Sequence, residues 1–317
     1  MLLSIVIPCY NESEVIADTN DKVIALADQW TEKGLIDSYE IVYIDDGSAD
    51  STLDILSDLA SKKPNIKVVS FSGNFGHQAA LTAGLKYAKG DAIVTLDADL
   101  QDPPETIEEM IVKFNEGYQI VYAVRKGRQN DTAFKRLTAQ CYYKLMKAMG
   151  VNLVYDHADF RLISAKVRDE FARYNEINRF LRGIFPLMGF KHCKVEYDRH
   201  QRLAGETKYP LKKMMAFAID GVTSFSYVPL RLASLLGFTI FLVTTVMIIW
   251  VLVAKLFGET VSGWTSTVLP IYAFGGIQLL CIGIVGEYVG KIYMEVKHRP
   301  IYIVGQTINI ENNLQKR

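Results

Sequence analysis

The sequence lacks several signatures that would place it in a common class of proteins. Its four cysteines are scattered, with no C-x-x-C pair and no zinc-ligand spacing, which argues against a disulfide framework and a zinc module. The 35 basic and 35 acidic residues balance, so bulk charge gives no reason to expect a nucleic-acid partner. Neither G-x-x-x-x-G-K-[ST] nor G-x-G-x-x-G occurs, which argues against a P-loop ATPase and a Rossmann dehydrogenase.

The first residues also lack the features of a signal peptide. MLLSIVIPCYNE has no basic n-region and no small-residue cleavage site, so we expect it to form a first β-strand. Scattered free cysteines favour a reducing compartment that faces the cytosol.

Charged residues are absent from two long apolar stretches in the second half, 232–254 and 260–286. A helix over the first stretch would span roughly 34 Å, enough to cross the hydrocarbon core of a bilayer. Two buried helices of a soluble core are the alternative. The short KLFGE connection favours a transmembrane hairpin, with helices at about 232–254 and 266–288.

Basic residues flank this hairpin on the side of both chain ends, whereas the connecting loop offers only Lys255 against Glu259. The positive-inside rule therefore predicts a multi-pass protein of the cytoplasmic (inner) membrane with both termini in the cytoplasm. We expect a domain at 1–205, an interfacial amphipathic segment at 206–230, the hairpin within 231–293 and a cytoplasmic tail at 294–317; a plain linker is the alternative for 206–230. The flanking basic residues are Lys208, Lys212, Lys213, Arg231, Lys291, Lys297 and Arg299.

Apolar runs alternate with helical patterns from residue 3 to about residue 125. The runs LSIVIP, YEIVYIDDG, IKVVSF, DAIVTLDAD and YQIVYAV read as strands, and the segments between them read as helices. His77 is expected to start a helix or to serve as a packing residue. Strands spaced in this way predict an α/β domain with a mainly parallel sheet covered on both faces. Such sheets bind ligands at the carboxyl ends of their strands.

Acidic and polar residues gather at those predicted strand ends. In TLDADLQDPPE, Asp97 and Asp99 alternate as strand residues do, so both carboxylates can face one way. Close carboxylates are costly unless a cation joins them, and hard oxygen ligands without histidine or thiolate suit Mg²⁺ or Mn²⁺. The sequence therefore predicts a divalent metal and a diphosphate at this edge. Asp102 before Pro103 predicts an N-cap and first-turn pair.

The motifs IVIPCYNE, YIDDGSADST, NFGHQAALTAG and LDADLQDPPE resemble the family-two, GT-A type glycosyltransferases. DFRLIS, NRFLRG, RLAGETKYPLKKM and GEYVGKIYMEVKHRPIYIV resemble the polyprenyl-phosphate glycosyltransferases, which include bactoprenol glucosyltransferases and dolichyl-phosphate mannose synthases. The resemblance covers nearly the whole chain. It implies a GT-A fold, Rossmann-like and mainly parallel, followed by a two-helix transmembrane hairpin.

The resemblance also implies roles for individual residues. Asp159 and Asp99 would be catalytic, with Asp159 acting either as a base or as a positioning group. Arg125, Arg202 and Lys208 would bind the phosphate or the acceptor. Two departures are Gly73, where many relatives carry a basic residue, and Thr207 in place of a common serine. The metal would bind Asp97, Asp99 and Gln101, and the nucleotide would bind Pro8, Tyr10, Asn11, Glu12, Asp45, Asp46, Asp97 and Ala98.

The activity implied is metal-dependent, inverting transfer of a sugar to undecaprenyl phosphate, with glucose from UDP-glucose as first choice. The product would serve a cell-envelope glycan, and the partners would be the nucleotide sugar, the lipid and the membrane; a homo-oligomer stays open. A mannose synthase using GDP-mannose and a catalytically inactive nucleotide-sugar-binding anchor are the alternatives. A processive polysaccharide synthase is disfavoured because the chain lacks a Q-x-x-R-W motif and further membrane helices.

Overall fold

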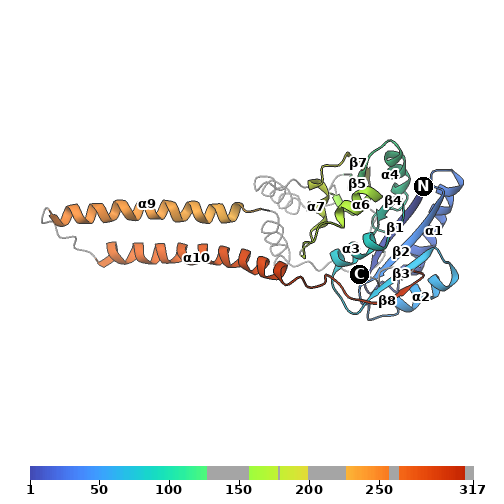
Figure 1. Cartoon of the computed structure of the whole chain (residues 1–317), viewed down its shortest axis with the longest axis horizontal. Coiled ribbons are helices and arrows are strands. Elements are labelled where there is room, and N and C mark those ends of the chain that lie inside the picture. Colours follow the sequence, from blue (N-terminus) through green and yellow to red (C-terminus); the bar gives the residue numbers. More distant parts are fainter. Residues whose placement is uncertain (127–156, 178, 199–225, 257–263, 311–317) are drawn as a thin grey trace. The chain divides into compact units, whose positions relative to one another are not determined.

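The computed structural model describes residues 1–126, 157–177, 179–198, 226–256 and 264–310. The chain divides into two compact units. The first contains the N-terminal domain and resumes at Arg299, and the second contains the two long apolar helices (Figure 1).

The first unit is built on an eight-stranded sheet of order β7-β5-β6-β4-β1-β2-β3-β8. Strand β1 pairs in parallel with β2 and β4, β2 with β3, and β5 with β7, whereas β6 and β8 pair antiparallel with their neighbours. The predicted mainly parallel sheet is therefore confirmed. The strands are β1 (Leu2–Cys9), β2 (Ser38–Asp45), β3 (Ile66–Phe71), β4 (Ala92–Thr95), β5 (Ile120–Arg125), β6 (His157–Ser164), β7 (His192–Tyr197) and β8 (Val304–Ile308).

Helices cover both faces of the central strands, which is why most residues of those strands are apolar and buried. One face of β1 packs with α1 (Ile16–Glu32), α2 (Thr52–Lys62) and α4 (Thr106–Asn115) in the main core. Helix α3 (His77–Tyr87) packs on the other face, and α6 (Ala165–Phe171) and α7 (Leu181–Leu187) pack near β6. A Cβ at Gly84 of α3 would lie 2.1 Å from Val6 Cγ1, so only glycine allows this approach.

The last strand of the sheet, β8, comes from the segment 294–317 that was predicted to be a cytoplasmic tail. Strand β8 pairs antiparallel with β3, with Val68 opposite Ile308 and Phe71 opposite Val304. Asn309 follows in the left-handed region and its side-chain amide donates to the carbonyls of Ala60 (2.6 Å) and Ile66 (2.9 Å). The edge of β3 is thereby covered, which removes an unpaired row of backbone groups.

The second unit contains α9 (Val228–Leu256) and α10 (Trp264–Val296), which lie side by side. Both helices begin before the predicted bounds and end after them. Val228–Met247 and Ala273–Val296 have mean hydropathies of 1.9 and 1.5, so both helices are long and apolar enough to cross a membrane. The Tyr288 hydroxyl of α10 donates to the Ser226 carbonyl at 2.5 Å. This hydrogen bond connects the C-terminal part of α10 to the residues just before α9.

Candidate active site

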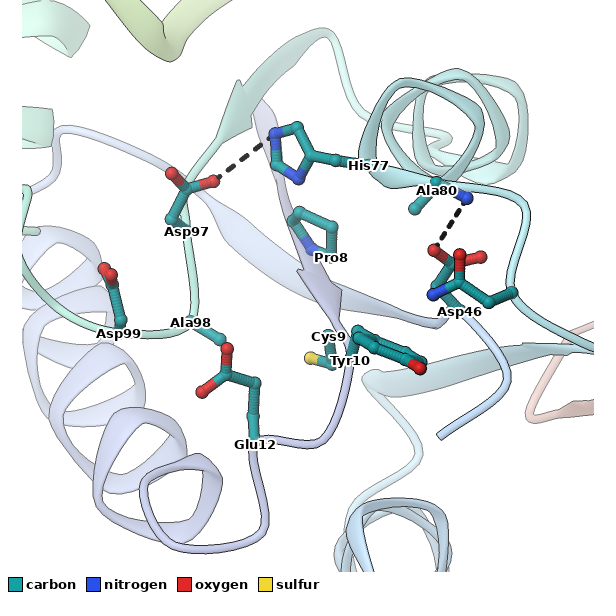
Figure 2. Close-up of a pocket in the computed structure, with 12 residues that line it drawn as sticks. Pro8, Cys9, Tyr10, Glu12, Asp46, His77, Ala80, Asp97, Ala98 and Asp99 are labelled. Carbon is teal, nitrogen blue, oxygen red and sulfur yellow. Dashed lines mark hydrogen bonds and ion pairs between the residues drawn. The ribbon is translucent and has the colours of Figure 1, made fainter. Parts of the chain in front are cut away.

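A cavity of about 270 Å³ opens where β1, β2 and β4 end and α3 begins (Figure 2). This is the carboxyl edge of the parallel strands, at which the sequence predicted that polar residues converge. The cavity is lined by Pro8, Cys9, Tyr10, Glu12, Asp46, Asn74, Gly76, His77, Ala80, Asp97, Ala98 and Asp99.

Two predicted nucleotide residues, Asn11 and Asp45, lie beside the cavity and shape the turn after β2. Asn11 adopts a left-handed backbone (φ 55°), and its side-chain oxygen accepts from the Ala49 amide at 2.8 Å. The buried Asp45 carboxylate accepts from the Ser48 amide (3.1 Å) and the Ser70 hydroxyl (2.7 Å). Both residues therefore hold backbone in place around the cavity.

Asp46 ties the wall of the cavity to the turn before α3. Its two carboxylate oxygens accept hydrogen bonds from the backbone amides of Phe75 (2.7 Å) and Gly76 (2.9 Å). Burial raises the pKa of Asp46, while these two amides oppose the rise. Gly76 has φ +96°, in the left-handed region, which lets the turn present both amides to one carboxylate.

Asp97 and Asp99 both reach the cavity, from the turn that follows β4. Burial, opposed by His77 and reinforced by the carboxylates of Asp159, Asp102 and Asp99, raises the pKa of Asp97 to about 6. A carboxyl group crowded by anions is what a divalent cation relieves, and oxygen donors suit Mg²⁺ or Mn²⁺. The residues present fit such an ion, although within the described ranges no group of three or more His, Cys, Asp or Glu side chains is arranged around one point.

The expected N-cap role of Asp102 is wrong. Helix α4 begins at Thr106 with Glu105 before it, and the Asp102 carboxylate is buried elsewhere. It accepts a 2.6 Å hydrogen bond from the Tyr197 hydroxyl and pairs with Arg125 Nη2 at 3.4 Å. Asp102 thus fastens the end of the 97–102 turn to β5 and β7, because a buried carboxylate is stable only with such partners.

His77, the first residue of α3, lies between two carboxylates. Its Nε2 is 3.7 Å from Asp97 Oδ1 and 3.6 Å from Asp159 Oδ2 (Figure 2 draws the Asp97 pair). Burial lowers the pKa of His77, but the two carboxylates outweigh burial and raise it overall. The expected helix start is confirmed, and the same residue also lines the cavity.

Asp159 is 4% exposed and holds several donors at once. One oxygen pairs with the buried Arg161; the other lies 3.0 Å from Arg182 Nη2 and accepts from Gln78 Nε2 at 3.2 Å. Burial alone would raise the pKa of Asp159, but Arg182, His77 and Arg161 hold it well below its usual range. The group is therefore an ionised anchor with little tendency to accept a proton.

Other predicted residues stand apart from the cavity lining. Gln101 is buried, and its backbone amide donates a hydrogen bond to Asp99 Oδ1 at 3.1 Å. The Arg125 guanidinium donates to the Asp102 carboxylate and the Tyr197 hydroxyl. Arg202 and Lys208 lie outside the described residues, as does most of the predicted interfacial segment 206–230.

Sequence reasoning missed the residues that surround Asp159. Arg161 follows two positions later on β6, so its side chain shares a face with Asp159, and this strand period was the available signal. Gln78 and Arg182 come from α3 and α7, and no local pattern places those helices beside one strand.

Comparison with known proteins gives the family. The model described as glycosyl transferase family 2 matches residues 4–171. The "uncharacterized glycosyltransferase YkcC" of Bacillus subtilis (strain 168) is 48% identical over 311 residues, covering 98% of this chain and 95% of the relative. The "prophage bactoprenol glucosyl transferase homolog" of Escherichia coli (strain K12) is 39% identical over 308 residues, covering 96% and 98%.

Among solved structures, glucosyl-3-phosphoglycerate synthase from Mycobacterium tuberculosis, in complex with Mn²⁺, uridine diphosphate and phosphoglyceric acid, is 22% identical. That match has a TM-score of 0.49 and covers 70% of this chain and 76% of the other. The family match spans more than half of the 317 residues and the relatives match almost end to end. The chain belongs to glycosyl transferase family 2 and is a glycosyltransferase.

Proposed function

We propose that this enzyme transfers glucose from UDP-glucose to the phosphate of undecaprenyl phosphate at the cytoplasmic face of the membrane, with inversion at the sugar. The observation that carries the proposal is the presence of one acidic cavity at a sheet edge in a chain with two long apolar helices. Relatives that align over nearly the whole chain are named bactoprenol glucosyl transferases, which supports a polyprenyl phosphate as acceptor.

The donor would bind in the cavity by its nucleotide and diphosphate. Tyr10 lines the cavity and is 47% exposed, so its ring can stack on a base, and the carboxylates of Asp46 and Glu12 can accept hydrogen bonds from the base and ribose. Asp97 and Asp99 would hold Mg²⁺ or Mn²⁺, with Gln101 in the same turn. The ion would supply positive charge that stabilises the departing diphosphate.

The acceptor needs little activation by the protein. A phosphate monoester loses its second proton near pH 6, so its attacking oxygen is largely anionic at neutral pH. Asp159, held ionised by two arginines, would therefore position groups instead of removing a proton. The Arg182 side chain is 42% exposed. It would add positive charge close to the donor diphosphate and the acceptor phosphate.

The membrane location follows from the acceptor, because a polyprenyl chain keeps its phosphate at the headgroup plane. Helices α9 and α10 would span the bilayer, and the basic flanks would place both termini in the cytoplasm. Lys208, Lys212 and Lys213 would attract anionic headgroups by about 1 kcal/mol each. A mannose synthase using GDP-mannose is the second candidate, favoured only by the same acidic cavity.

The test uses full-length protein in membranes with radiolabelled UDP-glucose, Mg²⁺ and undecaprenyl phosphate. We expect label in the organic phase, and expect EDTA or Asp99→Ala to abolish it. Asp54→Ala, at an exposed position of α2, is the matched control and should retain full activity. Full transfer in EDTA, or by Asp99→Ala, would contradict metal dependence, and labelling from GDP-mannose alone would favour the second candidate.

A further inference from the structure

The C-terminal strand β8 begins beside the turn that forms one wall of the cavity. The Ser72 amide donates to the Ile303 carbonyl at 2.9 Å, directly after β3 pairs with β8. We propose that Tyr302 is a positioning residue for donor binding, acting through Phe71 and the 72–76 turn on Asp46. The proposal rests on the function above in taking the cavity as the site of the nucleotide sugar.

An aromatic cluster forms the first part of this connection. The rings of Tyr302 and Phe71 are stacked, with centroids 4.8 Å apart and planes at 10°. Phe71 also meets Phe75 edge to face, with centroids 5.8 Å apart and planes at 87°. Both are favourable arrangements for aromatic rings, and Phe71 is 4% exposed. Movement of the Tyr302 ring therefore removes a support from Phe71, which in turn contacts Phe75.

The turn forms the second part, because it is bonded directly to Asp46. The backbone amides of Phe75 and Gly76 donate to the two Asp46 oxygens. A Cβ at Gly47 would lie 2.4 Å from the Gly73 carbonyl carbon, so the turn also packs against the residue after Asp46. Such close contact transmits a displacement of the turn to Asp46, which lines the cavity.

The far end of the strand is fixed independently, by the Asn309 side-chain amide on the carbonyls of Ala60 and Ile66. Residues 297–303 connect the end of α10 at Val296 to the start of β8 at Val304. The residue that positions the donor wall thus belongs to the short connection between the second apolar helix and the catalytic sheet. Through Tyr302, the segment 297–303 after α10 would influence the affinity for the donor without touching the donor itself.

The experiment compares Tyr302→Ala with two variants in full-length protein. We expect Tyr302→Ala to raise the KM for UDP-glucose by roughly fivefold to tenfold, with kcat and the KM for the lipid within twofold. Tyr302→Phe keeps the stacked ring and should stay within twofold on every parameter. Tyr39→Ala removes a half-buried tyrosine at the opposite, amino end of β2, and should lower thermal stability without changing the donor KM.

Hydrogen–deuterium exchange decides the proposal whichever nucleotide sugar is the donor. Tyr302→Ala should speed exchange of the Phe75 and Gly76 amides, and Tyr39→Ala should leave them protected. Unchanged exchange there, or an equal rise in both alanine variants, overturns the proposal. If wild-type protein fails to use UDP-glucose, the proposed donor is wrong, and exchange still tests the role of Tyr302.

Discussion

Asp159 and Arg182 form an ion pair of 3.0 Å in which the Asp159 side chain is almost fully buried and the Arg182 side chain is 42% exposed. Arg161 approaches the other carboxylate oxygen from the same strand and is itself buried. The buried Asp159 carboxylate therefore pairs with two arginines, the buried Arg161 and the partly exposed Arg182. The arrangement orients Arg182 while keeping the carboxylate ionised.

We predict that Asp159→Asn acts mainly by unpairing Arg161. Removing one partner of a buried ion pair costs about 3–5 kcal/mol, so the melting temperature should fall by several degrees. Because its pKa is held well below its usual range, Asp159 stays ionised from pH 5 to 9, and the kcat profile of wild-type enzyme should carry no ionisation of this group.

Thermal melts and pH profiles of full-length protein check this prediction. Asp169→Asn is the matched control, since Asp169 pairs with Arg168 on the surface with 67% of its side chain exposed and should cost under about 1 kcal/mol. The positioning role would be contradicted by two results together: a wild-type kcat that depends on an ionising base, and a stable Asp159→Asn protein in which that pH dependence is lost.

Tyr197 is predicted to stabilise, through Asp102, the 97–102 turn that we propose binds the metal. Its hydroxyl donates to the buried carboxylate at 2.6 Å, and Leu100 in the same turn has a left-handed backbone (φ 50°). Tyr197→Phe leaves Asp102 with the longer Arg125 contact, at a cost of about 1–3 kcal/mol. We expect roughly tenfold more Mn²⁺ for half-maximal binding, measured by titration calorimetry.

Tyr118→Phe provides the comparison for that experiment. Tyr118 offers its ring to Lys191 Nζ, 4.4 Å from the ring centroid, and phenylalanine keeps that ring. Mn²⁺ binding should be unchanged. Equal Mn²⁺ affinity in wild type and Tyr197→Phe would show that the turn holds its shape without the hydroxyl.

Mn²⁺ binding should weaken in acid because of Asp97. Its pKa of about 6 lies above the ordinary aspartate value, so a proton competes with the metal below pH 6. The apparent dissociation constant should rise about tenfold per pH unit below 6 and level off above pH 7. Titrations at pH 5, 6, 7 and 8 measure this, and a constant affinity from pH 5 to 8 would contradict the raised pKa.

Gly84→Ala is predicted to disturb the packing of α3 on β1. The new methyl group would lie 2.1 Å from Val6 Cγ1, and overpacking of this kind costs about 1–3 kcal/mol. Helix α3 carries His77 at its start, so the donor KM should rise together with the loss of stability. Gly34→Ala is the control for added side-chain volume, because no atom beyond the two neighbouring residues lies within 4 Å of the new methyl group. Its φ of +69° adds backbone strain of its own. Thermal melts and donor kinetics compare the two variants.

Much of the fold was readable because its signals are local. The apolar runs, the helices between them and the two charge-free stretches each appear within one continuous segment, and the confirmed parallel sheet follows from their alternation. The gathering of Pro8, Asp46 and Asp97 was predictable too, since parallel strands end at one edge.

The sequence by itself determined the strand-and-helix order up to about residue 125, the two apolar helices, the family motifs and the acidic sheet edge. Only the tertiary structure decided that Asp102 bonds to Tyr197 instead of capping α4, that Arg182 reaches Asp159, and that β8 completes the sheet. These contacts join residues from distant segments, and no local pattern specifies them. Their partners are fixed by burial and charge compensation, which exist only once the chain has packed.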